Sequence, residues 1–429
     1  MRNLPAAHAG PIFFASQLAV VIAFWAVWQT GRRMLGERQA LVGVLLLEGV
    51  IYYNFTSPEF NANILQLPFW ALIGWSFYRA VKDNRLVDWL LLGLWSAGGL
   101  YSKYSTVLLL ATLGFVMLVR PEGRRRLRGP GPWLAVATAF ILFLPHILWL
   151  FANNFIPFDY ASNQLRPLHH SFSLLFGLVG GQLLALLPAA LLYFAVFSRQ
   201  QQHGEDSLHS FDRAFLCSIT FGPFMLTFLA ATITGFKIHD MWGTPFWNFI
   251  GLWAIFRFPP KLSRESLQRF AFGWSLIFIF CIAAYAGSVI YGPYITHKTE
   301  RIHFPGRALA KTMGAAWHDR FQRPMKYVIG DIWPAGNVAY YSKERPHVLI
   351  MGDYKISPWI NPADLAKEGG IIVWCVRHCA RHDYEEVIPP FVHDEFPQAE
   401  IQAPFTLPRE TGAEVDPVVM DWAVLAPKQ

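Results

Sequence analysis

The sequence predicts a polytopic α-helical membrane protein of about ten transmembrane helices with a C-terminal extracytoplasmic α/β domain. The 429 residues are 54% hydrophobic and 15% charged, whereas an ordinary soluble domain carries roughly 25% charged residues. The charge is also uneven, because residues 1–292 hold 33 charged side chains and the remaining 137 residues hold 32. We therefore predict a transmembrane domain over 1–292 and a soluble domain over 293–429.

Ten apolar stretches in the first part are candidates for crossing a bilayer. They are 11–30, 39–53, 63–79, 87–101, 104–119, 133–152, 171–197, 214–234, 243–257 and 270–292. A membrane-spanning helix needs about 20 residues, so the stretches 39–53, 87–101 and 243–257 are short. We expect their polar ends to extend these helices.

The basic residues predict the orientation of these helices. One set of loops holds 17 of them: Arg32, Arg33, Arg38, Arg79, Lys82, Arg85, Arg120, Arg124, Arg125, Arg126, Arg128, Arg199, Arg213, Arg257, Lys261, Arg264 and Arg269. The alternate set holds four, namely Arg2, Lys103, Arg166 and Lys237. Cytoplasmic loops carry the excess of Lys and Arg, so both termini and the C-terminal domain are predicted to lie outside the cytoplasm. Topology thus explains the net charge of +7, and no nucleic-acid partner is expected.

The C-terminal part has the pattern of a small α/β layer. Apolar residues recur at helical spacing over 306–321, and strand-like runs follow at 326–329, 348–351, 371–376 and 418–425. Helix candidates at 335–342 and 362–368 lie between the first three runs. Alternating strands and helices predict an α/β arrangement.

Two carboxylates near the first predicted outer loop are candidate catalytic residues. Glu59 lies within the loop 52–63, and Glu48 lies one helical turn before Tyr52. A carboxylate at this depth could act as a base, bind a divalent cation or orient an acceptor hydroxyl. Alternatively, Glu59 has no catalytic role and is an acid at the start of a helix after Pro58, a position that the helix dipole favours.

Lys103 is the basic residue of the next outer turn, 101–105, between two apolar stretches. An ammonium group at the outer membrane surface is a suitable ligand for phosphate. The alternative is a lysine whose stem extends along the helix end and places its charge in water.

Two later outer loops carry further candidates. Asp159 and Arg166 lie in a loop of carboxamides and aromatics suited to sugars or phosphates, or to a plain membrane interface. In the loop 235–245, Lys237 could bind phosphate, while His239 and Asp240 could bind metal or transfer protons. Two ligands alone do not make a metal site, and a solvated loop is the alternative.

Other motifs add little chemistry. Cys375 and Cys379, with His382, match no common zinc spacing, so a disulfide or two free thiols is favoured over a metal. The sequence contains no phosphate-loop lysine motif, no dinucleotide-binding glycine fingerprint and no nucleophile elbow. No cofactor is firmly predicted, and a divalent metal cation is an open alternative.

Several short stretches, taken in order, resemble membrane glycosyltransferases of the GT-C class. The resemblance is closest to the bacterial family-39-like enzymes that group with protein O-mannosyltransferases and aminoarabinose transferase. It rests on 57–63, 67–70, 98–105, 237–247 and 330–337.

The resemblance implies an inverting transfer from a polyprenyl-phosphate sugar to a lipid or glycan acceptor, at the outer face of a bacterial cytoplasmic membrane. By position, Glu59 is similar to the acid of the family's second outer loop, Lys103 to its phosphate-binding lysine and Lys237 to a late basic residue. Asn61 and Tyr104 lie in the resembling stretches and are also predicted to bind substrate.

The start of the chain departs from the family pattern. The family's main catalytic acid lies in a first large outer loop after a first helix, whereas this sequence begins after that region. The predicted orientation also places Met1 outside. We therefore expect an N-terminal helix and loop to be missing, and little or no transferase activity without them.

Two other functions remain alternatives. One is a non-catalytic membrane scaffold with a partner-binding outer domain. The other is a lipid or solute transporter, which predicts polar residues through the spans and inverted repeats; the sequence shows neither feature.

Overall fold

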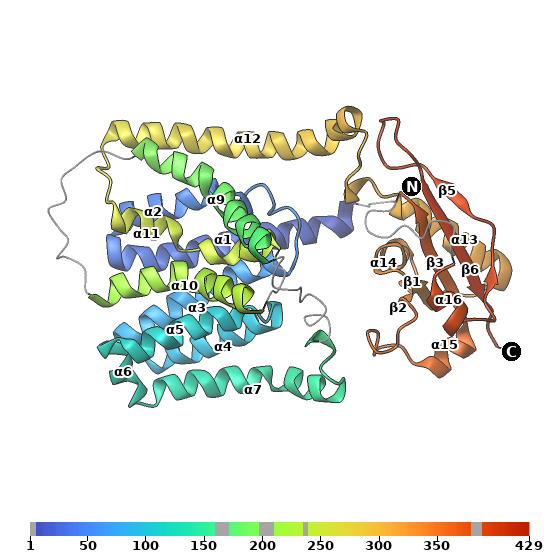
Figure 1. The fold of residues 1–429 in the computed structure, drawn as a ribbon, viewed down its shortest axis with the longest axis horizontal. Coiled ribbons are helices and arrows are strands. Elements are labelled where there is room, and N and C mark those ends of the chain that lie inside the picture. The colour runs from blue at the N-terminus through green and yellow to red at the C-terminus, as the bar shows by residue number, and fades with distance from the viewer. Residues whose placement is uncertain (1–5, 159–170, 197–209, 235–238, 379–387, 429) are drawn as a thin grey trace. The chain divides into compact units, whose positions relative to one another are not determined.

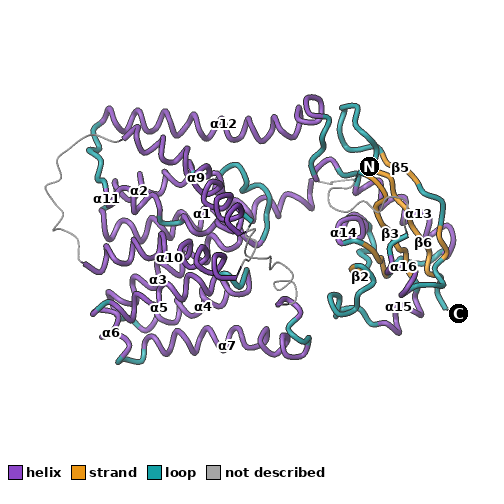
Figure 2. The backbone as a smooth tube through the Cα atoms, viewed as in Figure 1, coloured by secondary structure: helices purple, strands orange, loops and turns teal. Residues whose placement is uncertain are grey.

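The computed structural model describes residues 6–158, 171–196, 210–234, 239–378 and 388–428. The chain forms two compact units, Met1–Ala283 and Ala284–Gln429, and the division falls within a long helix. The first unit is helical and the second combines a sheet with helices, as Figure 2 shows by colour.

The helical unit begins with α1 (Ala6–Leu35), α2 (Glu37–Leu45) and the two 3-10 turns η1 (Leu46–Gly49) and η2 (Ile51–Tyr53). Five helices follow: α3 (Ala62–Asp83), α4 (Leu86–Ser102), α5 (Thr106–Val119), α6 (Pro121–Leu127) and α7 (Gly131–Ala152). The later elements are α9 (Ser171–Val196), α10 (Ser210–Thr234), η4 (Asp240–Trp247), α11 (Ile250–Arg257) and α12 (Arg264–Thr296) (Figure 1).

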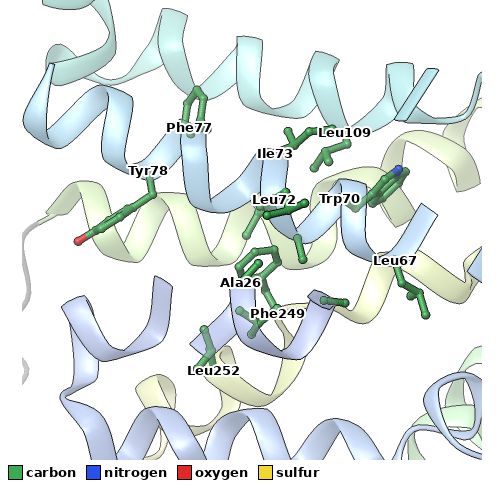
Figure 3. Packing of buried hydrophobic residues seen from close by; sticks show 14 of the residues in the cluster. Ala26, Leu67, Trp70, Leu72, Ile73, Phe77, Tyr78, Leu109, Phe249 and Leu252 are labelled. Carbon is green, nitrogen blue, oxygen red and sulfur yellow. The ribbon is translucent and has the colours of Figure 1, made fainter. Parts of the chain in front are cut away.

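Helix α3 is at the centre of the helical core. Its residues Trp70, Ile73 and Phe77 are almost completely buried. Figure 3 shows them among side chains from other elements, including Leu109 of α5 and Phe249 beside α11. Because α3 contacts α1, α4 and η4, it provides a fixed frame for the loops at its ends.

Several helices are suited to crossing a membrane. Within the described residues, five are long and apolar enough: Gly10–Leu35, Gly131–Ala152, Phe176–Val196, Ser210–Thr234 and Arg264–Thr296. The bent pair α5 and α6 makes a sixth if it counts as one span. Helices α3 and α4 occupy two further predicted stretches, but α4 has only 17 residues. The predicted mostly helical membrane fold is confirmed.

Two predicted spans are corrected, because 39–53 and 243–257 are not continuous helices. In the first, Val50 has an extended backbone between η1 and η2. Gly49 packs so closely on α9 that a Cβ there would lie 2.6 Å from Ala189 Cα. In the second, the chain passes from η4 to α11 through Phe249, whose backbone is not helical. Neighbouring protein covers both breaks, and non-helical backbone at membrane depth is tolerated under such cover.

The second unit has the predicted α/β architecture. It contains η5 (Arg301–His303), α13 (Gly306–Phe321), β1 (Tyr327–Gly330), α14 (Ile332–Tyr341), β2 (His347–Ile350), α15 (Pro362–Glu368), β3 (Gly370–Arg377), α16 (Pro390–Glu395), β4 (Glu400–Ile401), β5 (Phe405–Leu407) and β6 (Val418–Leu425). The sheet order is β2-β1-β3-β6-β4, with β5 also paired to β6. Strands β1, β2 and β3 are parallel and β6 is antiparallel.

Every strand and helix predicted for this unit is present, and among the described residues the short η5, α16, β4 and β5 are the elements that were not predicted. Cys375, at the buried end of β3, is disulfide-bonded. This agrees with the preference for a disulfide over a zinc ligand. Cys379 and His382 lie outside the described residues.

Candidate functional site

Lys103 is the point at which three distant segments of the helical unit meet. It ends α4 with an extended backbone, φ −170° and ψ 138°. Its Nζ donates a hydrogen bond of 2.8 Å to Oδ1 of Asn63, at the start of α3. The same Nζ lies 4.6 Å from the ring centroid of Trp242 in η4, a cation–π distance. The turn 101–105, the first turn of α3 and η4 therefore form one site.

The ammonium group of Lys103 has neutral partners. Within the part of the chain that the structure describes, no carboxylate lies within ion-pair distance of its Nζ. Burial lowers the pKa of Lys103 from 10.5 to about 8, because desolvation disfavours the charged form. A partly buried cation without a counter-charge is suited to bind an anionic ligand.

A hydrogen-bond network holds the Lys103 turn against α3. Gln66 Nε2 donates to Ser105 Oγ at 2.9 Å and to Thr106 Oγ1 at 3.2 Å. Trp70 Nε1 donates to Thr106 Oγ1 at 3.1 Å, and that hydroxyl donates to the Gly99 carbonyl at 2.8 Å. These hydrogen bonds hold the residues on both sides of Lys103, from Gly99 to Thr106, and so keep Lys103 next to Asn63.

A second network positions η4, which carries Trp242. The Tyr52 hydroxyl donates to the Asp240 carbonyl at 2.9 Å. Gln182 Nε2 donates to Tyr52 Oη at 2.9 Å and to the Asp240 carbonyl at 3.0 Å, and its Oε1 accepts from Trp247 Nε1 at 2.8 Å. Residues of η2, α9 and η4 thus fix the loop beside Lys103.

Close approach of η4 to α9 depends on a glycine. A Cβ added to Gly243 would overlap Gln182 Oε1, the atom that accepts the Trp247 hydrogen bond. A larger residue at this position would require the Gln182 side chain to move away from Trp247.

Tyr104 faces an aromatic cluster next to Lys103. Its hydroxyl forms a hydrogen bond of 2.6 Å with His146 Nε2, and its ring stacks on Phe158 at a centroid distance of 5.8 Å. The His146 ring stacks on Trp149 at 5.4 Å. His146 is therefore a packed, hydrogen-bonded histidine.

Glu59 and Asn61 lie in the loop that leads to Asn63. Helix α3 begins at Ala62, and the Asn61 side chain caps it by accepting from the backbone N–H groups of Asn63 and Ile64 at 2.8 and 3.3 Å. The side-chain amide of Asn61 also donates to the Glu59 carbonyl at 2.9 Å. Glu59 is exposed and lies before the cap, so the alternative of an acid in the first helical turn does not hold.

Glu48 lies elsewhere in the helical unit. It is 8% exposed in η1 and interacts electrostatically with Cys281 of α12. Among the described residues, no contact joins the side chain of Glu48 to Lys103.

The remaining predicted residues divide into two groups. His239 and Asp240 are exposed at the start of η4, and the His239 ring contacts Trp242 at 5.3 Å. Asp159, Arg166 and Lys237 lie outside the described residues. No group of three or more His, Cys, Asp or Glu side chains that could hold a metal occurs within the described ranges.

The sequence analysis did not assign roles to Asn63, Trp242, Tyr52 or Gln182. Asn63 and Trp242 stand in stretches that the resemblance had already marked, so their polarity and aromaticity were available signals. Gln182 lies in an apolar helix at 2% exposure. A buried amide of this kind is a signal in its own right, because it must find hydrogen-bond partners.

The chain is similar in sequence to several known proteins. Residues 4–149, which include Asn63 and Lys103, match the family model described as dolichyl-phosphate-mannose-protein mannosyltransferase. The lipopolysaccharide core galacturonosyltransferase RgtA of Rhizobium johnstonii is 22% identical over 381 residues, which cover 85% of this chain and 73% of RgtA. The galacturonosyltransferase RgtB of the same organism is 24% identical over 336 residues, which cover 75% of this chain and 63% of RgtB.

Two solved structures share the fold. ArnT from Cupriavidus metallidurans bound to undecaprenyl phosphate aligns with a TM-score of 0.55 at 10% identity, over 96% of this chain and 83% of that one. The apo state of ArnT aligns with a TM-score of 0.51 at 12% identity, over 97% and 84%. The predicted resemblance to the GT-C class is confirmed.

Proposed function

We propose that this protein transfers a glycosyl group from a polyprenyl-phosphate sugar to a lipid or glycan acceptor, with inversion, at the outer face of a bacterial cytoplasmic membrane. The observation that carries the proposal is Lys103, a partly buried ammonium group held by the neutral partners Asn63 and Trp242. Undecaprenyl phosphate in ArnT and the lipopolysaccharide core in the names of RgtA and RgtB support these substrate classes.

The chemistry requires a cation at the leaving group. When an acceptor hydroxyl attacks the anomeric carbon, the bond between that carbon and the lipid phosphate breaks and negative charge develops on the phosphate. A prepositioned ammonium group stabilises this charge without reorganising at the moment of reaction. Asn63 fixes the Lys103 stem in one orientation, and the Trp242 face contacts the cation without neutralising it.

A carboxylate would remove the proton from the acceptor hydroxyl. Glu59 is the stronger candidate because it is exposed and lies in the same loop as Asn63. Glu48 is buried in a turn that packs on α9 and has no described contact with the Lys103 site. We therefore assign the general base to Glu59, with a divalent cation as an open participant.

The test is glycosyl transfer in membranes that contain the full chain. Radiolabelled polyprenyl-phosphate sugars would be offered with lipopolysaccharide core acceptors, and the product analysed for anomeric configuration. The chain that begins at Met1 is compared with a form extended upstream of Met1. In the form that transfers from one donor, we expect Lys103→Ala and Glu59→Gln to abolish transfer, and Glu410→Gln, an exposed acid of the other unit, to leave it unchanged. Donor binding without transfer would favour a non-catalytic relative, and no donor binding would favour a membrane scaffold.

A further inference from the structure

An apolar cavity of about 480 Å³ lies among α3, α4, α5, α6 and α7. Its lining includes Trp89, Leu92, Leu113, Met117, Leu127 and Pro132. The hydroxyl of Ser96, which also lines it, donates to the Leu92 carbonyl at 2.7 Å. Such a wall offers water few hydrogen-bond partners, whereas a hydrocarbon chain fits it. Leu118 and Val136, at the rim, are 62% and 61% exposed, so the cavity opens on the lipid-facing side.

A short basic helix lies at one end of this cavity. Helix α6 is bent by 97° from α5, so it runs across the direction of the spanning helices, as a helix at a membrane surface does. Leu127 of α6 lines the cavity. Arg124 lies three residues earlier, on the same side of the helix, and Arg128 directly follows Leu127.

The bend is built into the packing. A Cβ on Gly123 would lie 2.5 Å from both Cα and O of Met117. Only glycine therefore lets α6 fold back on the end of α5.

The arginines of this segment fall into two groups. Arg120 donates to Ser210 Oγ at 2.5 Å, and Arg126 donates to the carbonyls of Val81 and Lys82 at 2.9 and 3.2 Å. By contrast, Arg124, Arg125 and Arg128 are exposed and form no ion pair with any residue that the structure describes. Glu122 is the single acid between 120 and 128, so the cavity mouth carries a strong net positive charge.

We propose that this cavity and α6 bind one anionic glycerophospholipid of the cytoplasmic leaflet. Its phosphate contacts Arg124 and Arg128, and one acyl chain enters the apolar cavity. Basic pockets between transmembrane helices on the cytoplasmic side suit such headgroups. Helices α4 and α5 join at the Lys103 turn, and α6 lies at the opposite end of α5 (Figure 1), so this site is distinct from the donor site.

The test is native mass spectrometry of the full chain in detergent, titrated with phosphatidylglycerol and separately with phosphatidylcholine. We expect one phosphatidylglycerol to bind at least about tenfold more tightly than phosphatidylcholine, because the anionic headgroup gains contact with two guanidinium groups. Arg124→Gln with Arg128→Gln should abolish this preference. The control pair Arg38→Gln with Arg264→Gln removes the same charge from exposed positions outside the cavity and should retain it.

The acyl chain is tested separately. Gly114 lines the cavity, and a Cβ there meets nothing within 4 Å. Gly114→Phe should fill the space and weaken binding of phosphatidylglycerol at least fivefold by an order-of-magnitude estimate, roughly 1 kcal/mol. Gly177→Phe, at an equally open position on α9, should not.

Three results would overturn the proposal. The first is equal binding of the two phospholipids. The second is an equal loss of the preference for phosphatidylglycerol in the test pair and in the control pair of arginine variants. The third is displacement of phosphatidylglycerol by undecaprenyl phosphate at equal concentration. The last result would assign the cavity to the donor lipid.

Discussion

Lys103 is a partly buried cation whose partners among the described residues, Asn63 and Trp242, are both neutral. Transfer of a charge from water to a partly buried position is costly unless the charge is paired. Here the ammonium group has an amide oxygen at 2.8 Å and an aromatic face at 4.6 Å. Both stabilise the cation weakly compared with a carboxylate, so a phosphate can still bind with a large gain.

The pH dependence of phosphate binding follows from the pKa of Lys103, which burial lowers to about 8. The charged form is the one that binds a phosphate, and it is complete below this pKa and lost above it. We expect the affinity for undecaprenyl phosphate to fall about tenfold per pH unit above about pH 8. Isothermal titration across this range measures it. Lys103→Arg should remove the dependence because arginine stays charged, and an unchanged profile in that variant would contradict the role of Lys103.

Asn63 provides a test of the neutral partner. Asn63→Asp places a carboxylate where an amide oxygen now accepts from Lys103, so it pairs the cation and repels phosphate. We expect undecaprenyl phosphate to bind at least about tenfold more weakly, a difference of about 1.4 kcal/mol.

Asn61→Asp is the matched control for this variant. It makes the same charge change two positions earlier, and aspartate caps a helix as well as asparagine does. Equal losses in the two variants would show that loop charge alone, not pairing with Lys103, controls binding.

Lys103 could be predicted as a phosphate ligand because it is the single basic residue of its turn. Its partners Asn63 and Trp242 could not be predicted, because they are far from Lys103 in the sequence and only the fold brings them to it. The cap of α3 by Asn61 has a local signal, because asparagine before a helix start is a preferred cap. Helical spacing predicts that Glu48 lies one turn before Tyr52, on the same side of a helix. The backbone is extended at Val50, so this spacing does not apply.

At the scale of elements, the site depends on segments that do not complete a regular helix. Turns η1, η2 and η4 lie where the sequence predicts two short spans. Gln182 of α9 forms hydrogen bonds with η2 and η4, and η1 packs closely on α9. The strands at 371–376 and 418–425 and the helix at 306–321 were predicted within a residue or two, because local patterning determines them. The breaks at Val50 and Phe249 arise from tertiary packing, which residue periodicity does not encode.

The packing of η4 on α9 gives a prediction for this scale. Gly243→Ala should displace Gln182, because the added Cβ overlaps its Oε1, and so move Trp242 away from Lys103. We expect a lower melting temperature and a decrease of about 1–3 kcal/mol in the free energy of unfolding. We also expect weaker binding of undecaprenyl phosphate. Gly177→Ala, on the helix that carries Gln182, has open space around it and should be neutral or slightly stabilising. Similar effects of the two substitutions would contradict this account of η4.

At the scale of the whole molecule, the charge distribution predicts the topology. Seventeen basic residues fall in one set of loops and four in the other, and Lys103 belongs to the sparse set. The disulfide at Cys375 fits an oxidising compartment, where such bonds persist. The charge distribution supports our proposal that the Lys103 turn lies outside the cytoplasm, and the disulfide supports the same proposal for the C-terminal unit.

Reporter fusions test this orientation. Alkaline phosphatase fused after Gln429 should be active, and green fluorescent protein at the same position should be dark, because the first folds only outside and the second only inside. Fusions after Arg128 should give the reverse. Activity of the fluorescent fusion at the C-terminus would invert the topology and place the Lys103 turn in the cytoplasm.

The most direct test of the central claim is the affinity of the full chain for undecaprenyl phosphate, measured beside three variants. We predict that Lys103→Met weakens binding at least about tenfold, as the loss of a charge-assisted hydrogen bond worth about 1.5–3 kcal/mol requires. Lys103→Arg should recover most of the affinity, and Lys311→Met, at an exposed position of α13, should have none of the effect. Undiminished binding by Lys103→Met, or an equal loss in Lys311→Met, would contradict the assignment of Lys103 as the phosphate ligand.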